Sequence, residues 1–338
     1  MAAVSEARAA AERLDQALSA APYDLPAVLL RSESASSSRI ENLTVSAKGV
    51  ALAQVGRGSS RNARLNVGNI ASMEAALTLD GVTAETMERI QGTLVDESSL
   101  RGFRDEPVWI SDNRYGPREA SFVPPAPERV PAYVEDLVAF AARADLDPLI
   151  KAFVFHAQFE TVHPFADGNG RAGRALVHLL LKDGGVCEAS CLPVSAGLLS
   201  DVVAYHGALT SFREGDAEPI VCLMAHSLLG ASHVAAALKA SMDDLLDEWR
   251  EKVGGRSGSC AERLGPLLVR NPAVTTDFVV GALGVGESAA KQALKRAVDA
   301  GMLTRVGAAR ASAYVCDRVL DAIEETCRMM PLRRGARG

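Results

Sequence analysis

The sequence predicts a mainly α-helical protein that carries one β-hairpin in its body and a small α+β domain at its C-terminal end. Apolar residues recur at helical spacing over most of the 338 residues, and β-prone runs are confined to two places. The Gly- and Ser-rich stretch at 254–259 is the clearest flexible joint. With 48% apolar and 23% charged residues, the composition is globular, and the length suits about two domains.

Helical periodicity predicts the body of the protein. It covers residues 9–18, 28–46, 73–94, 132–143 and 148–160, and a further helix should run from about 170 to 182. A hairpin is predicted over 108–123, because β-prone runs at 108–110 and 120–123 flank a turn-rich stretch from Ser111 to Pro117. The body should therefore be helical, with one hairpin projecting from it.

The segment after the joint has the order of elements that is typical of a winged helix. Short helices are predicted at 261–269, 275–283 and 288–300, followed by strands at 302–306 and 312–315. From residue 256 onward 13 Lys and Arg stand against 8 Asp and Glu, whereas the preceding part has 23 against 34. The third helix carries a polar, basic face made of Lys291, Gln292, Lys295 and Arg296. This face suits contact with DNA, and protein docking or homodimer formation through the same domain is an equal alternative.

Composition also bears on the compartment. No run of about 18 apolar residues is present, so we expect no transmembrane helix and no membrane partner. Glu6, Glu12 and Asp15 do not fit a signal peptide. The six cysteines are scattered, and the closest pair, Cys187 and Cys191, lacks the further Cys or His ligands of a zinc site. We expect a cytoplasmic protein.

The segment from His163 to Arg174 carries the strongest chemical signal. Pro164 disfavours helical geometry at His163, and Gly168 and Gly170 permit close approach of backbone to a ligand. The apolar run that follows starts a helix whose free N–H groups form an anion site. Arg171 and Arg174 lie one turn apart and can reach one polyphosphate, Asp167 can hold Mg²⁺, and His163 can take a proton from a hydroxyl.

Two other interpretations of this segment are weaker. A histidine before proline is commonly structural, but this one shares its loop with an acid, an amide and two arginines. Gly168, Gly170 and Gly173 also match the dinucleotide-binding fingerprint. That fingerprint must follow a β-strand, and residues 148–160 have helical period, so the context excludes it.

The run from His163 to Arg174 resembles the complete Fic signature, His-Pro-Phe-x-Asp-Gly-Asn-Gly-Arg-x-x-Arg, at every fixed position. The resemblance implies a helical Fic core that transfers AMP from Mg·ATP to Ser, Thr or Tyr hydroxyls. It implies His163 as general base and Asp167 as Mg²⁺ ligand. Nucleotide binding would fall to the loop and the helix after it, through Phe165, Gly168, Asn169, Gly170, Arg171 and Arg174. Such a site works by positioning and charge neutralisation.

A second motif precedes the core. Ser37 and Glu41 lie four residues apart and share one face of a helix, and Asn42 follows. The motif resembles the Fic inhibitory sequence Ser/Thr-x-x-x-Glu-Gly/Asn, which implies that Glu41 pairs with Arg174 and blocks the productive pose of the γ-phosphate. One guanidinium cannot bind a carboxylate and a phosphate bidentately at once. An ordinary helix cap is the alternative.

Two further features are compared with the family. The hairpin at 108–123 resembles the flap that binds a target protein as an added strand, with a purely structural hairpin as the alternative. Downstream, the family commonly has Asn-Arg-x-x-Tyr-Tyr near the adenosine, and here only Tyr205 survives, as a candidate base-stacking ring. This departure leaves adenine selectivity less secure than phosphate binding.

The predicted organisation follows from these features. Residues 1–95 form an N-terminal helical region with an inhibitory helix at about 28–46, and 96–235 form the catalytic core. Residues 236–258 are a connecting helix and linker, and 259–320 are the winged helix. The function expected is that of an autoinhibited protein adenylyltransferase. Removal of AMP by the same fold and nucleotide sensing by a DNA-binding regulator are the alternatives.

Overall fold

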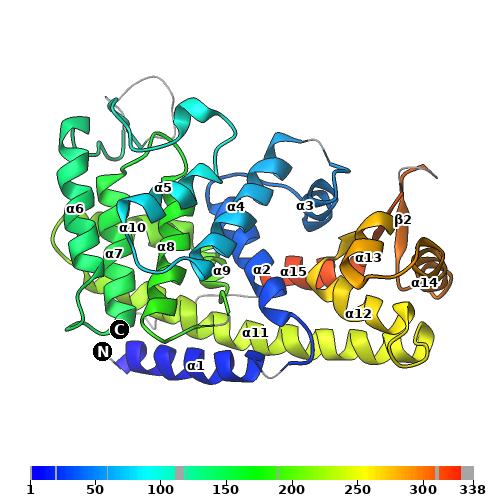
Figure 1. Ribbon diagram of the computed structural model, residues 1–338. Helices are drawn as coiled ribbons and strands as arrows, with labels where there is room; N and C mark the ends of the chain where they lie inside the picture. Colours follow the sequence, from blue (N-terminus) through cyan, green and yellow to red (C-terminus); the bar gives the residue numbers. More distant parts are fainter. Residues whose placement is uncertain are drawn as a thin grey trace.

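The computed structural model describes residues 2–19, 21–58, 60–110, 118, 120–188, 190–308 and 312–328. The helices of the body within these residues are α1 (Ala2–Ser19), α2 (Leu25–Ile40), α3 (Ala47–Gln54), α4 (Arg61–Thr78), α5 (Ala84–Gly92), η1 (Ser98–Leu100), η3 (Pro127–Arg129), α6 (Val130–Ala141), α7 (Pro148–Val162), α8 (Asn169–Asp183), α9 (Val194–Ser200), α10 (Val202–Arg213) and α11 (Glu218–Lys252). Figure 1 shows that helices dominate this part, which confirms the predicted fold class.

The C-terminal part combines helices with a small sheet. Its elements are α12 (Cys260–Arg270), β1 (Ala273–Val274), α13 (Thr276–Leu283), α14 (Glu287–Asp299), β2 (Thr304–Val306), β3 (Ala313–Val315) and α15 (Asp317–Thr326). The strands are antiparallel in the order β1-β3-β2, with Arg305 opposite Tyr314 and Ala273 opposite Val315. Three helices and a β2–β3 hairpin follow one another as predicted, whereas α15 was not predicted.

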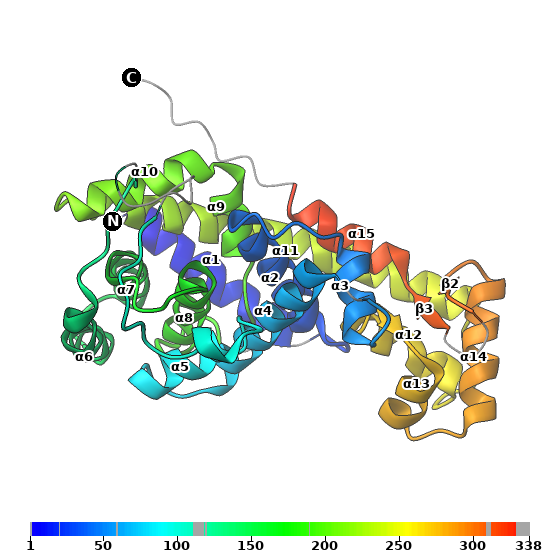
Figure 2. The same cartoon turned by 90° about the horizontal axis from the view of Figure 1, so that it is seen from above.

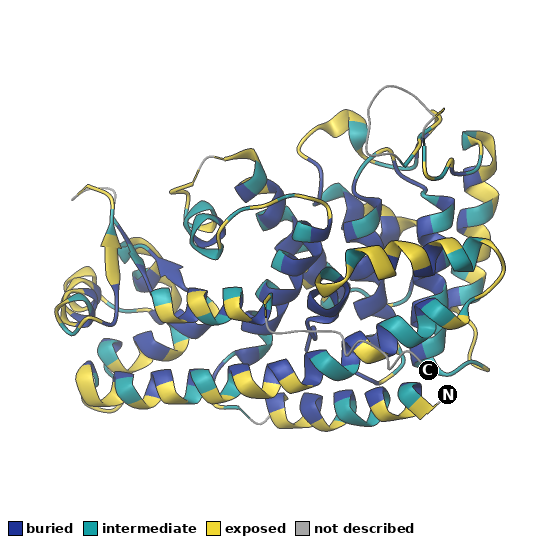
Figure 3. Cartoon of the chain, turned by 180° about the vertical axis from the view of Figure 1, so that it is seen from behind, coloured by how far each residue is buried: buried dark blue, intermediate teal, exposed yellow. Residues whose placement is uncertain are grey.

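The 35-residue helix α11 joins the two parts. It packs along α1, α9 and α10 at one end and against α12 and α15 at the other (Figures 1 and 2). The predicted boundary at residue 235 therefore lies inside a continuous helix. By length and composition α11 could cross a membrane, but half of its most apolar window is buried inside the protein. Figure 3 shows buried residues on its inner side and exposed residues on its outer side, as in an amphipathic helix that lies over a core.

The core of the body surrounds α8. Helices α2, α4, α5 and α7 all contact it, and every residue from Arg171 to Leu181 is buried. Phe153, Phe155 and Phe159 on α7 are fully buried beside it. Helix α8 is thus fixed on several sides, which makes its N-terminus a rigid base for a site.

The predicted helix at 28–46 was wrong at both ends. Helix α2 already begins at Leu25, because Asp24 accepts a hydrogen bond from the Ala27 amide and Pro26 occupies the first turn. It ends at Ile40, because Asn42 adopts the left-handed conformation with φ 58°. Asparagine tolerates this conformation better than most residues, so it stops the helix directly after Glu41.

The left-handed backbone at Asn42 gives a stability prediction. Asn42→Ala is expected to lower the free energy of unfolding by about 1 kcal/mol, because an alanine Cβ is strained at this φ, whereas Asn42→Gly is expected to change it little. Urea denaturation of the two variants measures the difference. An equal loss of stability in both would show that the asparagine side chain matters and its conformation does not.

The predicted continuous helix at 73–94 was also wrong. The chain forms α4 and α5 instead, separated by a turn in which Gly81 has φ 70° and Thr83 caps α5 through a reciprocal hydrogen bond with Thr86. Turn and cap chemistry there overrides the apolar spacing. Of the hairpin at 108–123, the described part is a bridge between Ile110 and Phe122, while residues 111–117 and 119 lie outside the described residues.

Candidate active site

The loop between α7 and α8 presents its residues with unusual backbone geometry. Helix α7 ends at His163, which is left-handed at φ 49°, and α8 begins after Gly168, left-handed at φ 86°. Between them Phe165 pairs with Phe103 through a β-bridge. A left-handed, non-glycine residue costs energy and persists only where neighbours hold it. This strained position therefore marks His163 as a functional candidate.

His163 is a buried, neutral imidazole. Its side chain is 20% exposed, and burial lowers its pKa to about 4. Its Nδ1 atom is inaccessible, has no hydrogen-bond partner, and lies 3.8 Å from Oε2 of Glu160. At neutral pH the ring is therefore uncharged and able to accept a proton.

The Ser37–Asn42 motif reaches the same place from the C-terminal end of α2. Oε1 of Glu41 accepts a hydrogen bond of 2.8 Å from Nη2 of Arg174, and Oγ of Ser37 accepts one of 2.9 Å from Nε. Burial opposes ionisation of Glu41, but Arg174 outweighs it and leaves the pKa of the carboxyl below its usual value. A Cβ at Gly170 would overlap Oε1 of Glu41, so this glycine lets the carboxylate lie against the start of α8.

A cavity of about 340 Å³ adjoins these groups. Its wall is formed by Glu41, Leu43, Arg61, Leu65, His163 and the loop residues 166–171. Arg171 lies at its edge, where Nη1 donates to the Leu94 carbonyl at 3.1 Å and Nη2 lies 3.8 Å from Asp167. The free N–H groups at the start of α8 and this guanidinium together make the cavity suitable for an anion.

Asp167 is the candidate metal ligand. Its side chain is 47% exposed, and its Oδ1 atom accepts a hydrogen bond of 2.6 Å from the Gly168 amide. No group of three or more His, Cys, Asp or Glu that could hold a metal occurs within the described residues. A single accessible carboxylate fits Mg²⁺, which usually takes one or two carboxylates and completes its shell with water and phosphate oxygens.

Residues 81–181, which contain this loop, match the Fic/DOC family. This segment of the chain is a Fic domain. The resemblance expected from the loop sequence is thereby confirmed.

Relatives agree with the assignment. The protein adenylyltransferase fic-1 of Caenorhabditis elegans is 29% identical over 147 residues, which cover 42% of this chain and 28% of that protein. The probable protein adenylyltransferase aq_aa38 of Aquifex aeolicus is 40% identical over 72 residues, 21% of this chain and 22% of that protein. The matched region thus spans about a quarter of the length of these curated relatives.

Solved structures share the fold over a longer range. A Fic family protein from Desulfovibrio desulfuricans has a TM-score of 0.60 at 22% identity and covers 94% of this chain and 96% of its own. Fic-1 of C. elegans, residues 134–508, has a TM-score of 0.54 at 18% identity, and the match covers 71% of this chain and 74% of that one. At these identities the likeness shows the fold.

Three predicted nucleotide-binding residues lie differently than expected. The ring of Phe165 is fully buried and stacks on the ring of Phe103, with 5.1 Å between the ring centroids, so it anchors the Fic loop to the core. The side-chain amide of Asn169 both donates to and accepts from the backbone of Phe165, which makes it a brace for the loop. Tyr205 is 2% exposed, and its hydroxyl lies 2.7 Å from Nε2 of His156. This burial does not favour stacking of the ring on a base, which stays a prediction from the sequence.

Sequence reasoning missed Arg61, Leu65, Arg104 and Glu160. Arg61 and Leu65 line the cavity from α4, far along the chain from the Fic loop, and only their helical spacing could have grouped them. Glu160 lies one turn before His163 and could have been found from that spacing. Burial raises the pKa of Glu160 to about 7, which Arg174 opposes and Glu41 reinforces.

Glu160 gives a prediction about stability and pH. A carboxyl whose pKa is raised by folding binds more protons in the folded state, so its contribution to stability is largest below pH 4.5 and falls as pH rises to about 7. The loss is expected to amount to about 3 kcal/mol at most. Glu160→Gln should remove this part of the pH dependence when urea unfolding is measured between pH 4.5 and 7.5. Parallel pH profiles for the two proteins would contradict the raised pKa.

Proposed function

We propose that this Fic-domain protein transfers AMP from Mg·ATP to a Ser, Thr or Tyr hydroxyl of a target protein, and that Glu41 restrains the transfer. The observation that carries the proposal is the neutral His163 beside an anion-binding cavity at the start of α8. The names of the relatives support the same activity. The match to them covers only part of each chain, so the activity of the whole protein is our inference.

Different residues of the site would serve different steps of such a reaction. The target hydroxyl oxygen would form a bond to the α-phosphorus of ATP as the bond to pyrophosphate breaks. Because Nδ1 of His163 is buried beside Glu160, Nε2 is the nitrogen left to take the hydroxyl proton. The α8 amides and Arg171 would neutralise the phosphates, and Mg²⁺ on Asp167 would shield the leaving pyrophosphate.

The restraint would act through Arg174. Its guanidinium is 2% exposed, and its Nε and Nη2 atoms already donate to Glu41 and to the side chain and carbonyl of Ser37. The γ-phosphate would have to compete with a charged partner that needs no further ordering. This arrangement supports the proposed inhibition by Glu41.

The position of the label tests the reaction class. Purified protein is incubated with Mg²⁺, lysate and ATP labelled on either the α- or the γ-phosphate. AMP transfer predicts label on protein from α-labelled ATP and none from γ-labelled ATP. Label from the γ-position would identify a kinase, and no label from either, also after Glu41 is replaced, would reject transfer.

Removal of AMP from a modified protein is the second candidate. It is favoured by the position of Glu41 in the cavity wall, 38% exposed, where a carboxylate could orient water. Purified AMP-modified protein distinguishes the two reactions. Hydrolysis that is lost in Glu41→Gln would favour removal.

The partners other than ATP are also proposals. The segment at 108–123 is proposed to dock the target, and the C-terminal part to contact DNA, another protein or a second copy. Lys291 pairs with Glu287, and Lys295 pairs with Asp299, each on the same helix, so two of the three basic residues of the proposed face are paired. This pairing favours protein contact over DNA. The six cysteines are free thiols, which fits the cytoplasm we propose.

A further inference from the structure

Arg104 is a buried arginine without a counter-ion among the described residues. It is 5% exposed, it takes part in none of their ion pairs, and burial lowers its pKa. Its guanidinium instead donates to four backbone carbonyls, at Glu106 (3.2 Å), Pro125 (2.6 Å), Val162 (3.4 Å) and His163 (2.8 Å). A buried charge that is satisfied only by carbonyls is costly, so a specific role is to be expected.

The four carbonyls belong to two segments. Val162 and His163 form the strained end of α7, while Glu106 and Pro125 stand at either end of the segment proposed to dock the target. The Arg104 amide also donates to the Pro164 carbonyl at 2.9 Å, and Phe103 stacks on Phe165. Phe103 and Arg104 therefore contact residues 163–165 of the Fic loop, and Arg104 also contacts both ends of the docking segment. We call this set of contacts the clasp.

We propose that Arg104 is a positioning residue that fixes His163 relative to the described ends of the docking segment at 108–123, and thereby sets the distance between the base and a docked hydroxyl. This inference rests on the proposed function. Arg104 does not line the cavity itself, and the only wall residue to which it donates is His163, so it acts on the hydroxyl side of the reaction and leaves ATP binding to other residues.

The charge of Arg104 provides a readout that a purely structural role would not move. Burial is the main cause of the low pKa of His163. Glu160 and Glu41 raise this pKa, whereas the charges of Arg104 and Arg213 lower it further. Loss of the Arg104 charge should therefore raise this pKa. The acid limb of the transfer rate would then move to higher pH, whereas a lysine would keep the limb in place.

The test compares Arg104→Met and Arg104→Lys in a Glu41→Gly background, with the exposed Arg101→Met as matched control. We expect Arg104→Met to lower kcat about 100-fold with KM for ATP unchanged, because a displacement of about 1 Å costs this much. Its acid limb should move upward, and Arg104→Lys should recover part of kcat with the limb unmoved. A parallel rise in KM, or an unmoved limb in Arg104→Met, would overturn the proposal.

Hydrogen exchange decides the question independently of activity. Arg104→Met should speed exchange of the amides at 106–110, 120–125 and 162–166 and leave α8 unchanged. Unchanged exchange in these segments would overturn the clasp even if AMP transfer proves to be the wrong reaction. If the Glu41→Gly parent transfers nothing while exchange responds as expected, the proposed function fails and the clasp stands.

A separate observation concerns α2, which lies between α8 and the C-terminal part (Figure 2). One side of α2 meets the Fic domain through Ser37 and through Glu33, which contacts His178 at 3.1 Å. Its other side is held by the C-terminal part: Nε of Arg31 donates to the Arg270 carbonyl, and Arg39 lies 3.9 Å from Glu324.

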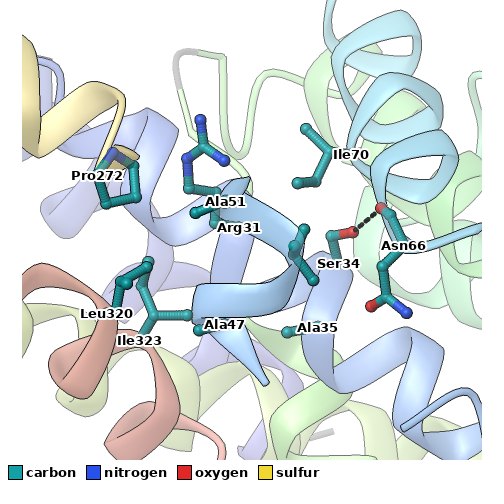
Figure 4. Close-up of a pocket in the computed structure, with 11 residues that line it drawn as sticks. Arg31, Ser34, Ala35, Ala47, Ala51, Asn66, Ile70, Pro272, Leu320 and Ile323 are labelled. Atoms are coloured by element: carbon teal, nitrogen blue, oxygen red, sulfur yellow. Dashed lines mark hydrogen bonds between the residues drawn. The ribbon is translucent and has the colours of Figure 1, made fainter. Parts of the chain in front are cut away.

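Glu324 links three helices. It sits on α15, faces Arg39 on α2, and accepts a hydrogen bond of 2.8 Å from the Ala47 amide at the start of α3. Beside this link, side chains from α2, α3, α4 and α15 surround a small cavity of about 20 Å³ (Figure 4). Apolar packing there is incomplete. Hydrogen bonds and ion pairs such as those of Glu324 therefore contribute more to holding α2 in place.

We infer that the C-terminal part holds α2 in the position from which Glu41 reaches Arg174, so that loosening the contacts of α15 with α2 would release the site. This second inference also rests on the proposed function. It assigns to α15 a role in regulation that does not involve the cavity directly.

Glu324→Gln tests it, with its exposed neighbour Glu325→Gln as matched control. We expect Glu324→Gln to raise AMP transfer about two- to five-fold, the range of a partly exposed ion pair, and to have no effect in a Glu41→Gly background. Exchange of the amides at 39–43 should rise in parallel. Unchanged exchange there would overturn the inference, while low transfer in Glu41→Gly itself would instead reject the restraint by Glu41.

Discussion

Glu41→Gly is expected to raise the rate of AMP transfer by about 10- to 100-fold. The substitution removes the charged partner of Arg174 at 2.8 Å but leaves both hydrogen bonds that Arg174 donates to Ser37, so the guanidinium keeps its position and is free to bind the γ-phosphate. A hydrogen bond to a charged group is worth about 1.5–3 kcal/mol, which sets the size of the effect. Initial rates of label transfer from α-labelled ATP measure it.

Glu41→Gln is the control for this experiment. The amide keeps the shape of the carboxylate and can still accept a hydrogen bond from Arg174, but it lacks the charge. We expect a smaller rise than with glycine, because a neutral partner competes less with phosphate. Equally low labelling by wild type and both variants would remove the case for inhibition by Glu41.

ATP binding offers a second way to observe the restraint. If Glu41 competes with the γ-phosphate, ATP should raise the thermal unfolding temperature of Glu41→Gly more than that of the wild type, whereas AMP should raise both alike. The comparison needs no target protein. It separates inhibition at the phosphate site from a loss of some later step.

The chemistry of the site was readable from the sequence because it lies in one continuous segment. His163, Asp167 and Arg171 are fixed by a glycine-bearing loop and the helix after it, and local rules suffice to place them. The partner of Arg174 lies 133 residues away, and only the resemblance of the Ser37–Asn42 motif connected the two. Arg104 was missed because a buried polar side chain carries no periodic signal, whereas Glu160 was missed although it lies one turn before His163.

The errors in the fold arose where a single residue overrides a pattern. Apolar spacing continues past Ile40 and across Asp80. The left-handed Asn42 nevertheless ends α2, and the turn before the capping residue Thr83 separates α4 from α5. Tyr205 shows a different limit of sequence analysis, because the sequence does not indicate whether an aromatic residue is buried or faces a ligand. Its hydrogen bond to His156 depends on how α7 and α10 pack.

His163→Ala is expected to lower AMP transfer by at least about 100-fold in the Glu41→Gly background, the usual contribution of a general base. Alanine is strained at the left-handed position, so His163→Asn, which tolerates φ 49°, is the better variant for separating chemistry from folding. Both should bind ATP as the parent does, because the phosphate-binding groups lie on α8. His206→Ala, an exposed histidine, is the matched control.

The pH dependence completes this prediction. With the pKa of His163 at about 4, the imidazole is already neutral above about pH 5, so the transfer rate of the parent should be flat from there to pH 8. Protonation below that range removes the acceptor, and the rate should fall as pH drops through the pKa. A rate that instead rises only near pH 6.5 would mean that water reaches the ring, and transfer retained in His163→Asn would mean that another group takes the proton.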